Sequence, residues 1–124
     1  MRVMVIGASR DRNKYGNRAL RTYIELGHDV VAINPKVGEI EGVRAYAGVL
    51  DPPGPIDRAI VYLPPEIGIE VVRELDQRND VHELWISPGA ESDELIEEAK
   101  RLGFDPIQAC AIVDAQSRGQ DAHN

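Results

Sequence analysis

Short apolar segments alternate with amphipathic segments along this chain. Runs of apolar residues predict strands at Met1–Ile6, Asp29–Ile33, Arg58–Leu63, Val81–Ile86 and Asp105–Cys110. Apolar residues spaced three or four positions apart predict helices at Asn17–Leu26, Pro64–Arg78 and Ser92–Gly103, with a short final helix at Ala111–Ala115. Strands and helices therefore alternate from the first residues to the last helix.

The strands are too apolar for a sheet that keeps one face in water. Such strands are typical of a parallel sheet covered by helices on both faces. We therefore predict an α/β fold, a Rossmann-like doubly wound parallel sheet of about five strands in the order 3-2-1-4-5. The Gly- and Pro-rich segment Lys36–Pro55 predicts a loop with one short helical turn and a weak strand at Val43–Tyr46.

Length and charge limit the classes of protein to consider. With 124 residues we expect one domain over residues 1–115 and a polar, disordered tail over 116–124. The net charge of -7 would repel a nucleic-acid backbone, so nucleic acid is not an expected partner. No apolar run approaches the roughly 20 residues of a membrane span, and no signal peptide is recognisable, so we expect a soluble, cytoplasmic protein that does not bind membranes. A single cysteine, Cys110, excludes an internal disulfide.

In doubly wound sheets, ligands bind at the carboxyl ends of the strands, beside the first strand. The loop Gly7–Gly16 occupies that place. Gly7 allows a sharp turn and the close approach of a pyrophosphate. The donors available to an anion are the backbone N–H groups of Ala8 and Ser9 and the side chains of Ser9, Arg10 and Lys14. The spacing does not match G-x-G-x-x-G, so this loop fits either a phosphate site or a plain connection.

The end of the second strand narrows the choice of ligand. An NAD-binding fold usually carries an acidic residue there for the ribose hydroxyls. This chain has Asn34-Pro35-Lys36 instead, and a lysine suits a ribose that bears a phosphate. NAD is therefore disfavoured, and both NADP and coenzyme A (CoA) remain.

Five segments together resemble a known family. They are VIGASRDRNKYG, AINPK, YLPPE, WISPGAESDELIEEAKRLGF and a cysteine after the last strand, in this order from Met1 to about Asp114. In this respect the chain resembles the small stand-alone CoA-binding domain proteins. Their fold is similar to the N-terminal CoA-binding domain of the succinyl-CoA synthetase α subunit.

The resemblance implies contacts with CoA from four segments. Gly7-Ala8-Ser9 would cradle the diphosphate, and Asn34-Pro35-Lys36 would flank the adenosine, with Lys36 near its phosphate. Leu63-Pro64-Pro65 would form a wall on the adenine or pantetheine side, and Ser87-Pro88-Gly89 would line the far edge. Many members have Gln-x-Gly at this last position, so a contact from a glutamine is in doubt here.

Three further side chains have open interpretations. Tyr15 would either stack on a base or pack on its own helix. Cys110, at the ligand edge, is either a buried apolar residue or a thiol that forms a mixed disulfide with CoA. His28 and His82 fall at the opposite edge, and the histidines do not have metal-ligand spacing.

We find no set of acid, base and nucleophile in the sequence. The prediction is therefore a cytoplasmic module that binds a small nucleotide ligand, CoA or acyl-CoA, without catalytic residues of its own. Two alternatives stay open: an NADP-binding regulatory domain, and a subunit of a CoA ligase or reductase that is active only with a partner chain.

Overall fold

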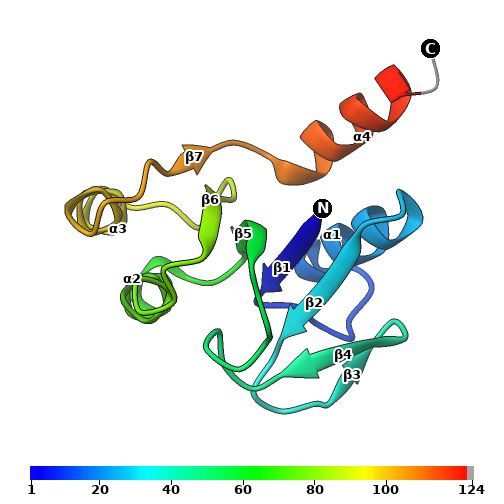
Figure 1. The fold of residues 1–124 in the computed structure, drawn as a ribbon, viewed down its shortest axis with the longest axis horizontal. Coiled ribbons are helices and arrows are strands. Elements are labelled where there is room, and N and C mark those ends of the chain that lie inside the picture. Colours follow the sequence, from blue (N-terminus) through cyan, green and yellow to red (C-terminus); the bar gives the residue numbers. More distant parts are fainter. Residues whose placement is uncertain (123–124) are drawn as a thin grey trace.

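The computed structural model describes residues 1–122, which form a seven-stranded sheet and four helices (Figure 1). In chain order the elements are β1 (Arg2–Ile6), α1 (Tyr15–Glu25), β2 (Asp29–Ile33), β3 (Glu39–Ile40), β4 (Val43–Tyr46), β5 (Ile56–Val61), α2 (Pro65–Leu75), β6 (Val81–Ile86), α3 (Asp93–Arg101), β7 (Ile107–Gln108) and α4 (Ala111–Ala122). The predicted α/β class and doubly wound architecture are confirmed.

The strands lie in the order β3-β4-β2-β1-β5-β6-β7, and all neighbours pair in parallel except β3 and β4. The predicted order was wrong in one respect. The weak strand β4 takes the place beyond β2, where Ala32 pairs with Ala45, so β5 pairs with β1 instead. Because β2 and β5 flank β1 on opposite sides, the switch point where ligands bind in such sheets lies between β1 and β5.

Three predicted elements differ in extent. The segment Lys36–Pro55 holds the β3–β4 hairpin, and in place of a helix it has a hydrogen-bonded turn in which the N–H of Asp51 donates to the carbonyl oxygen of Gly48 at 3.2 Å. The last strand is only two residues long, because Pro106 has no N–H to donate to the sheet. The final helix continues beyond Ala115 to Ala122. The domain boundary after residue 115 stays a prediction. Residues 123–124 of the predicted tail lie outside the described residues.

Two apolar cores cover the two faces of the sheet. Successive residues of a strand point to opposite faces. Along β1, Met4 and Ile6 therefore pack with α2 and α3, whereas Val3 and Val5 pack with α1 and α4. All four side chains are buried, and Figure 1 shows the two helix pairs on opposite sides of the sheet. This packing covers both faces and leaves the ends of the strands for ligands.

A buried arginine joins α4 to the sheet. Arg58 of β5 is 2% exposed, and its Nη1 donates hydrogen bonds to Tyr23 Oη at 2.9 Å and Asp114 Oδ2 at 2.8 Å. Its Nε donates to Glu83 Oε1 at 2.8 Å, and the guanidinium lies 4.3 Å from the centre of the Trp85 ring. The charge is thus fully paired, as burial requires.

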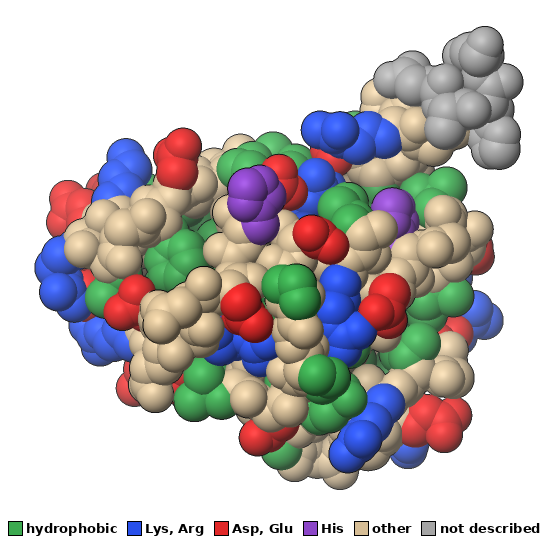
Figure 2. Space-filling model, viewed as in Figure 1, with side chains coloured by type: hydrophobic (Ala, Val, Ile, Leu, Met, Phe, Trp, Pro, Cys, Tyr) green, Lys and Arg blue, Asp and Glu red, His purple; other side chains and the backbone are tan. Residues whose placement is uncertain are grey.

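Charges of both signs are interspersed over the face of the molecule shown in Figure 2. Within residues 1–122, no helix combines the length and the apolar character needed to cross a membrane.

Candidate ligand-binding site

Two glycines bring the start of α1 directly against the end of β1. Gly7 has φ +87°, and a Cβ there would lie 2.3 Å from the carbonyl oxygen of Tyr62. A Cβ on Gly16 would lie 2.3 Å from the carbonyl oxygen of Gly7. Neither position has room for a side chain. Gly16 therefore supplies the close packing of helix on strand that the last glycine of G-x-G-x-x-G supplies in other folds.

The side chain of Asn17 stabilises the loop between Gly7 and Gly16, and Asn17 was not among the residues predicted for the site. Its side chain is buried, and Nδ2 donates a hydrogen bond to the carbonyl oxygen of Ser9 at 2.8 Å. Its Oδ1 accepts a bond from Arg21 Nε at 2.7 Å. The Ser9 hydroxyl in turn accepts the N–H of Asp11 at 3.0 Å. An asparagine in the first turn of a helix is the only sequence signal for this contact.

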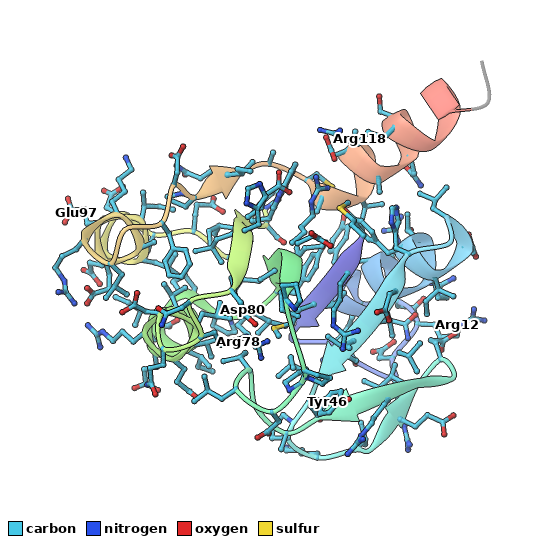
Figure 3. All side chains as sticks on the ribbon, viewed as in Figure 1. Arg12, Tyr46, Arg78, Asp80, Glu97 and Arg118 are labelled. Carbon is cyan, nitrogen blue, oxygen red and sulfur yellow. The ribbon has the colours of Figure 1, made fainter. Side chains whose placement is uncertain are left out.

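The basic residues of the loop have different surroundings. Arg10 Nε donates to the carbonyl oxygen of Glu39 at 3.0 Å, and Arg10 does not line the cleft described below. Arg12, labelled in Figure 3, lies 3.5 Å from a carboxylate oxygen of Glu41. Lys14 lines both parts of the cleft. Of these three side chains, Lys14 alone lines the cleft.

A cleft with two lobes runs along the carboxyl edge of the sheet. The lobe beside β2, here called the β2 lobe, has a volume of about 680 Å³, and the lobe beside β6, the β6 lobe, has about 580 Å³. Both are of the size that small-molecule sites usually have. The residues that line both lobes, and so form their boundary, are Gly7, Lys14, Tyr62, Leu63 and Pro64.

The β2 lobe gathers the residues predicted for the nucleotide. Ala8, Ser9, Asn34, Pro35 and Lys36 all line it. Asn34 ties the two loops together, because its Nδ2 donates to the carbonyl oxygen of Ala8 at 3.0 Å and its Oδ1 accepts the N–H of Lys36 at 2.7 Å. Hydrogen bonds thus connect the two loops that line this lobe, and Lys14 lines it as well.

The outer wall of the β2 lobe comes from the loop after β4 and from α2, two segments that were not predicted for the site. Residues 47–49 line it, opposite Glu74. Arg78 anchors this loop: its Nη1 donates to the carbonyl oxygens of Val49 at 2.9 Å and Pro52 at 2.7 Å. Asp80 accepts a bond from Arg78 Nε at 2.9 Å, and the pair is labelled in Figure 3.

Two residues that line the β6 lobe have buried hydroxyl groups that make no hydrogen bond within the described structure. They are Tyr62 Oη and Ser87 Oγ. Burial raises the pKa of Tyr62 far above its ordinary value, the Ser87 hydroxyl lowers it somewhat, and the nearby Cys110 raises it. Cys110 is a half-buried free thiol in the same lobe.

Most of the other residues that line the β6 lobe were predicted for the site, but Gly16 and Ala90 were not. Pro65, Pro88 and Gly89 line it as expected. Tyr15 also lines it but is 62% exposed, and its ring lies 5.0 Å from the guanidinium of Arg18. The ring therefore contacts its own helix while one side faces the lobe. This observation fits both interpretations of Tyr15.

Tyr62 was missed because it was assigned to a strand. The strand ends at Val61, which is level with Ile6 of β1 and Ile86 of β6. The next residues along the three strands, Gly7, Tyr62 and Ser87, therefore start the three loops at the ligand edge. A comparison of the registers of β1, β5 and β6 would have shown that Tyr62 starts a loop at the ligand edge.

A third cavity of about 420 Å³ lies at the opposite edge, where β6 begins. Asp76, Glu83 and Asp105 line it together with His82. Three carboxylates would repel a polyphosphate. In the described part of the chain, no cluster of His, Cys, Asp and Glu side chains is placed to hold a metal ion. The carboxyl-edge cleft is therefore the better candidate for a nucleotide.

Comparison with known proteins agrees with this geometry. The family model described as the CoA binding domain matches residues 1–116. The chain is 33% identical over 110 residues to ADP-forming acetate–CoA ligase I of Archaeoglobus fulgidus, a match that covers 82% of this chain but 16% of the ligase. The chain thus spans about a sixth of the length of this curated relative.

Two other matches are close to this chain in length. The solved structure of a conserved hypothetical protein from Pyrococcus furiosus superposes with a TM-score of 0.85 at 32% identity, covering 91% of this chain and 97% of that one. The uncharacterized protein YneT of Bacillus subtilis is 24% identical, covering 90% of this chain and 82% of that protein. The resemblance noted in the sequence is confirmed, and the chain belongs to the CoA-binding domain family.

Proposed function

We propose that this protein binds CoA or an acyl-CoA in the two-lobed cleft, with the adenosine diphosphate portion in the β2 lobe and the pantetheine arm in the β6 lobe. The observation that carries the proposal is the joining of two different lobes at Gly7, on the switch point of the sheet. Lys14 and Lys36 line the β2 lobe, whereas prolines and Cys110 line the β6 lobe, with Lys14 at the boundary. An elongated ligand with phosphates at one end and a slender neutral arm at the other fits this order.

The phosphates have specific partners in this proposal. Lys14, at the boundary of the lobes, faces the diphosphate together with the backbone of Gly7-Ala8-Ser9. Lys36, at the end of β2, faces the phosphate on the adenosine ribose. Asn34 and Pro35 flank the adenosine, while Leu63 and its following prolines shape the passage between the lobes.

The β6 lobe favours CoA over NADP. Apart from Lys14 at the boundary, it is lined by uncharged residues, among them Leu63, Pro65, Pro88 and Ala90. The pantetheine arm carries a hydroxyl and two amides, but its dimethyl and methylene groups give it aliphatic surface that packs against such prolines. A nicotinamide riboside, with a ribose diol and a carboxamide, has no such aliphatic segment.

The first experiment is a thermal-shift series with CoA, dephospho-CoA, acetyl-CoA, NAD and NADP at matched concentrations. A ligand at about 100 times its Kd adds roughly 2.7 kcal/mol to the free energy of unfolding. For a domain of this size the midpoint rises by on the order of 10 °C. We expect a shift with CoA and acetyl-CoA and a smaller one with dephospho-CoA. A shift with NADP alone would contradict the proposal and favour the regulatory alternative.

We further propose that binding is not accompanied by catalysis by this chain alone. The similarity to the acetate–CoA ligase favours one second candidate, a subunit of a CoA ligase that requires a partner chain. Incubating the purified chain with acetate, CoA and ATP tests the first point. We expect no acetyl-CoA, and its formation would show that the chain carries a catalytic set of its own.

A further inference from the structure

Two hydroxyl groups in the β6 lobe are buried without a hydrogen-bond partner. Ser87 is 4% exposed, and neither its Oγ nor Tyr62 Oη makes a hydrogen bond within the described structure, although Ser87 lies close enough to Tyr62 to lower the pKa of its hydroxyl. Most buried polar groups in folded proteins are hydrogen-bonded, because a buried group without a partner loses its hydrogen bonds to water and gains none in the protein. An unpaired buried group that lines a pocket therefore indicates a place where a ligand supplies the missing partner.

We infer that Tyr62 and Ser87 together receive a carbonyl oxygen from the pantetheine or acyl portion of the ligand. This inference rests on the proposed binding of CoA and adds a recognition site to it. Both residues directly follow level positions of neighbouring strands, Val61 and Ile86, so both hydroxyls belong to the same end of the sheet. Both residues line the β6 lobe.

The chemistry of the pair selects a neutral acceptor. Each hydroxyl has one proton to donate, and a carbonyl oxygen has two lone pairs that accept both. The raised pKa of Tyr62 keeps its proton in place at neutral pH. A carboxylate or phosphate would need a cation beside the pair, whereas the Cys110 thiol acts on Tyr62, and Lys14, the one cation among the described residues that line this lobe, lies at its boundary. A thiol or thioether sulfur is a weak acceptor and would leave the hydroxyls poorly paired.

Two parts of an acyl-CoA offer such an oxygen. The pantetheine arm has amide carbonyls, which free CoA also contains. The acyl group has a thioester carbonyl, which free CoA lacks. Either oxygen would accept the same hydrogen bonds from the two hydroxyls. Ligands with and without the thioester carbonyl distinguish the two sources.

The test measures the affinity of the wild type, Tyr62→Phe and Ser87→Ala for CoA, acetyl-CoA and S-ethyl-CoA by calorimetry. S-ethyl-CoA has the size of acetyl-CoA without the thioester carbonyl. Tyr46→Phe and Ser117→Ala remove hydroxyls from residues that do not line the cleft and serve as controls. We expect the two cleft variants to lose affinity by roughly threefold to tenfold, and the controls to keep it.

The pattern of loss identifies the source of the oxygen. An equal loss for all three ligands assigns the pair to a pantetheine amide, and a loss confined to acetyl-CoA assigns it to the thioester. Unchanged affinity of both variants for all three ligands would overturn the inference while leaving CoA binding intact. If the wild type binds none of the three ligands, the proposed function itself fails, and the inference falls with it.

The thermal midpoint of the free protein gives a second readout. Because the hydroxyls make no hydrogen bond within the described structure, removing either one should leave the midpoint unchanged or raise it. Weaker binding together with an unchanged or higher midpoint supports recognition. A lower midpoint in both variants would mean that the hydroxyls stabilise the fold, and would overturn the inference.

Discussion

At the residue scale, two lysines of the cleft are proposed to serve different phosphates of the ligand. Lys14 lines both lobes, whereas Lys36 lines the β2 lobe alone. The third lysine of the chain, Lys100, lies on α3, does not line the cleft, and provides a matched control. The three positions allow the same substitution to be compared in three surroundings.

Alanine substitutions at these lysines should separate the two phosphate sites. Lys36→Ala should weaken CoA by roughly tenfold or more and leave dephospho-CoA unchanged, because only CoA carries the ribose phosphate. Lys14→Ala should weaken both ligands, and Lys100→Ala neither, as measured by calorimetry. Equal losses for CoA and dephospho-CoA in Lys36→Ala would contradict the assignment of Lys36.

Cys110 should form a mixed disulfide with CoA when CoA disulfide is supplied. The thiolate of Cys110 attacks one sulfur of the disulfide, a protein–CoA disulfide forms, and the other CoA leaves as a thiol. Intact-protein mass spectrometry should detect one CoA adduct that a reductant removes. Cys110→Ser should carry no adduct. Absence of a reducible adduct on the wild type would show that the thiol is not reachable from the β6 lobe.

At the element scale, the turn from β1 to α1 depends on the contact between Gly7 and Gly16. Gly16→Ala would press a methyl group against the Gly7 carbonyl, so the helix start has to move. We expect a loss of about 1–3 kcal/mol in the free energy of unfolding, measured with urea, together with weaker CoA binding. Gly38→Ala is the control, because a Cβ there has open space. Equal stabilities of the two variants would contradict this account.

The elements were predictable where one local pattern decides them. The helix predicted from Ser92 begins there, because Ser92 Oγ accepts the N–H of Leu95 at 3.1 Å and caps α3. The helix predicted to end at Leu26 is followed by Gly27, which has φ +86°. The strand order was mispredicted, because β4 has four residues and its place beyond β2 is set by pairing between segments distant in sequence. Local patterns do not contain that information.

Because local patterns do not contain tertiary contacts, some residues of the cleft were not predicted. The loops at the strand ends follow from the fold class, so Gly7, Asn34 and Lys36 were predictable. Asn17 and the wall at residues 47–49 depend on tertiary contacts. Arg10 was predicted for the ligand because of its neighbours in sequence, whereas its Nε bonds the β3–β4 hairpin; a contact of Arg10 with the ligand stays a prediction.

At the scale of the whole molecule, the Arg58 network should make stability depend on pH. Burial raises the pKa of Asp114, but its bonds to Arg58 and Arg118 outweigh burial and hold the pKa below the ordinary 3.8. The folded state thus binds this proton less readily than the unfolded chain. The stabilisation is therefore complete above pH 3.8 and is lost as the pH falls through the lower pKa of the folded state.

Urea unfolding at about pH 6 and about pH 3 tests this dependence. Asp114→Asn should lower stability at the higher pH and show a smaller loss on acidification than the wild type. Asp105→Asn, at an exposed position, should behave as the wild type does. An acid dependence of Asp114→Asn equal to that of the wild type would contradict a role for this carboxylate.

The division of the cleft into two lobes that meet at Gly7 has a consequence for affinity. A ligand that spans the boundary is in effect bivalent, since binding of its nucleotide half holds its other half beside the second lobe at a high effective concentration. Neither half needs to bind strongly by itself. A nucleotide diphosphate or a pantetheine fragment alone would dissociate quickly, and only the intact ligand would stay bound for long.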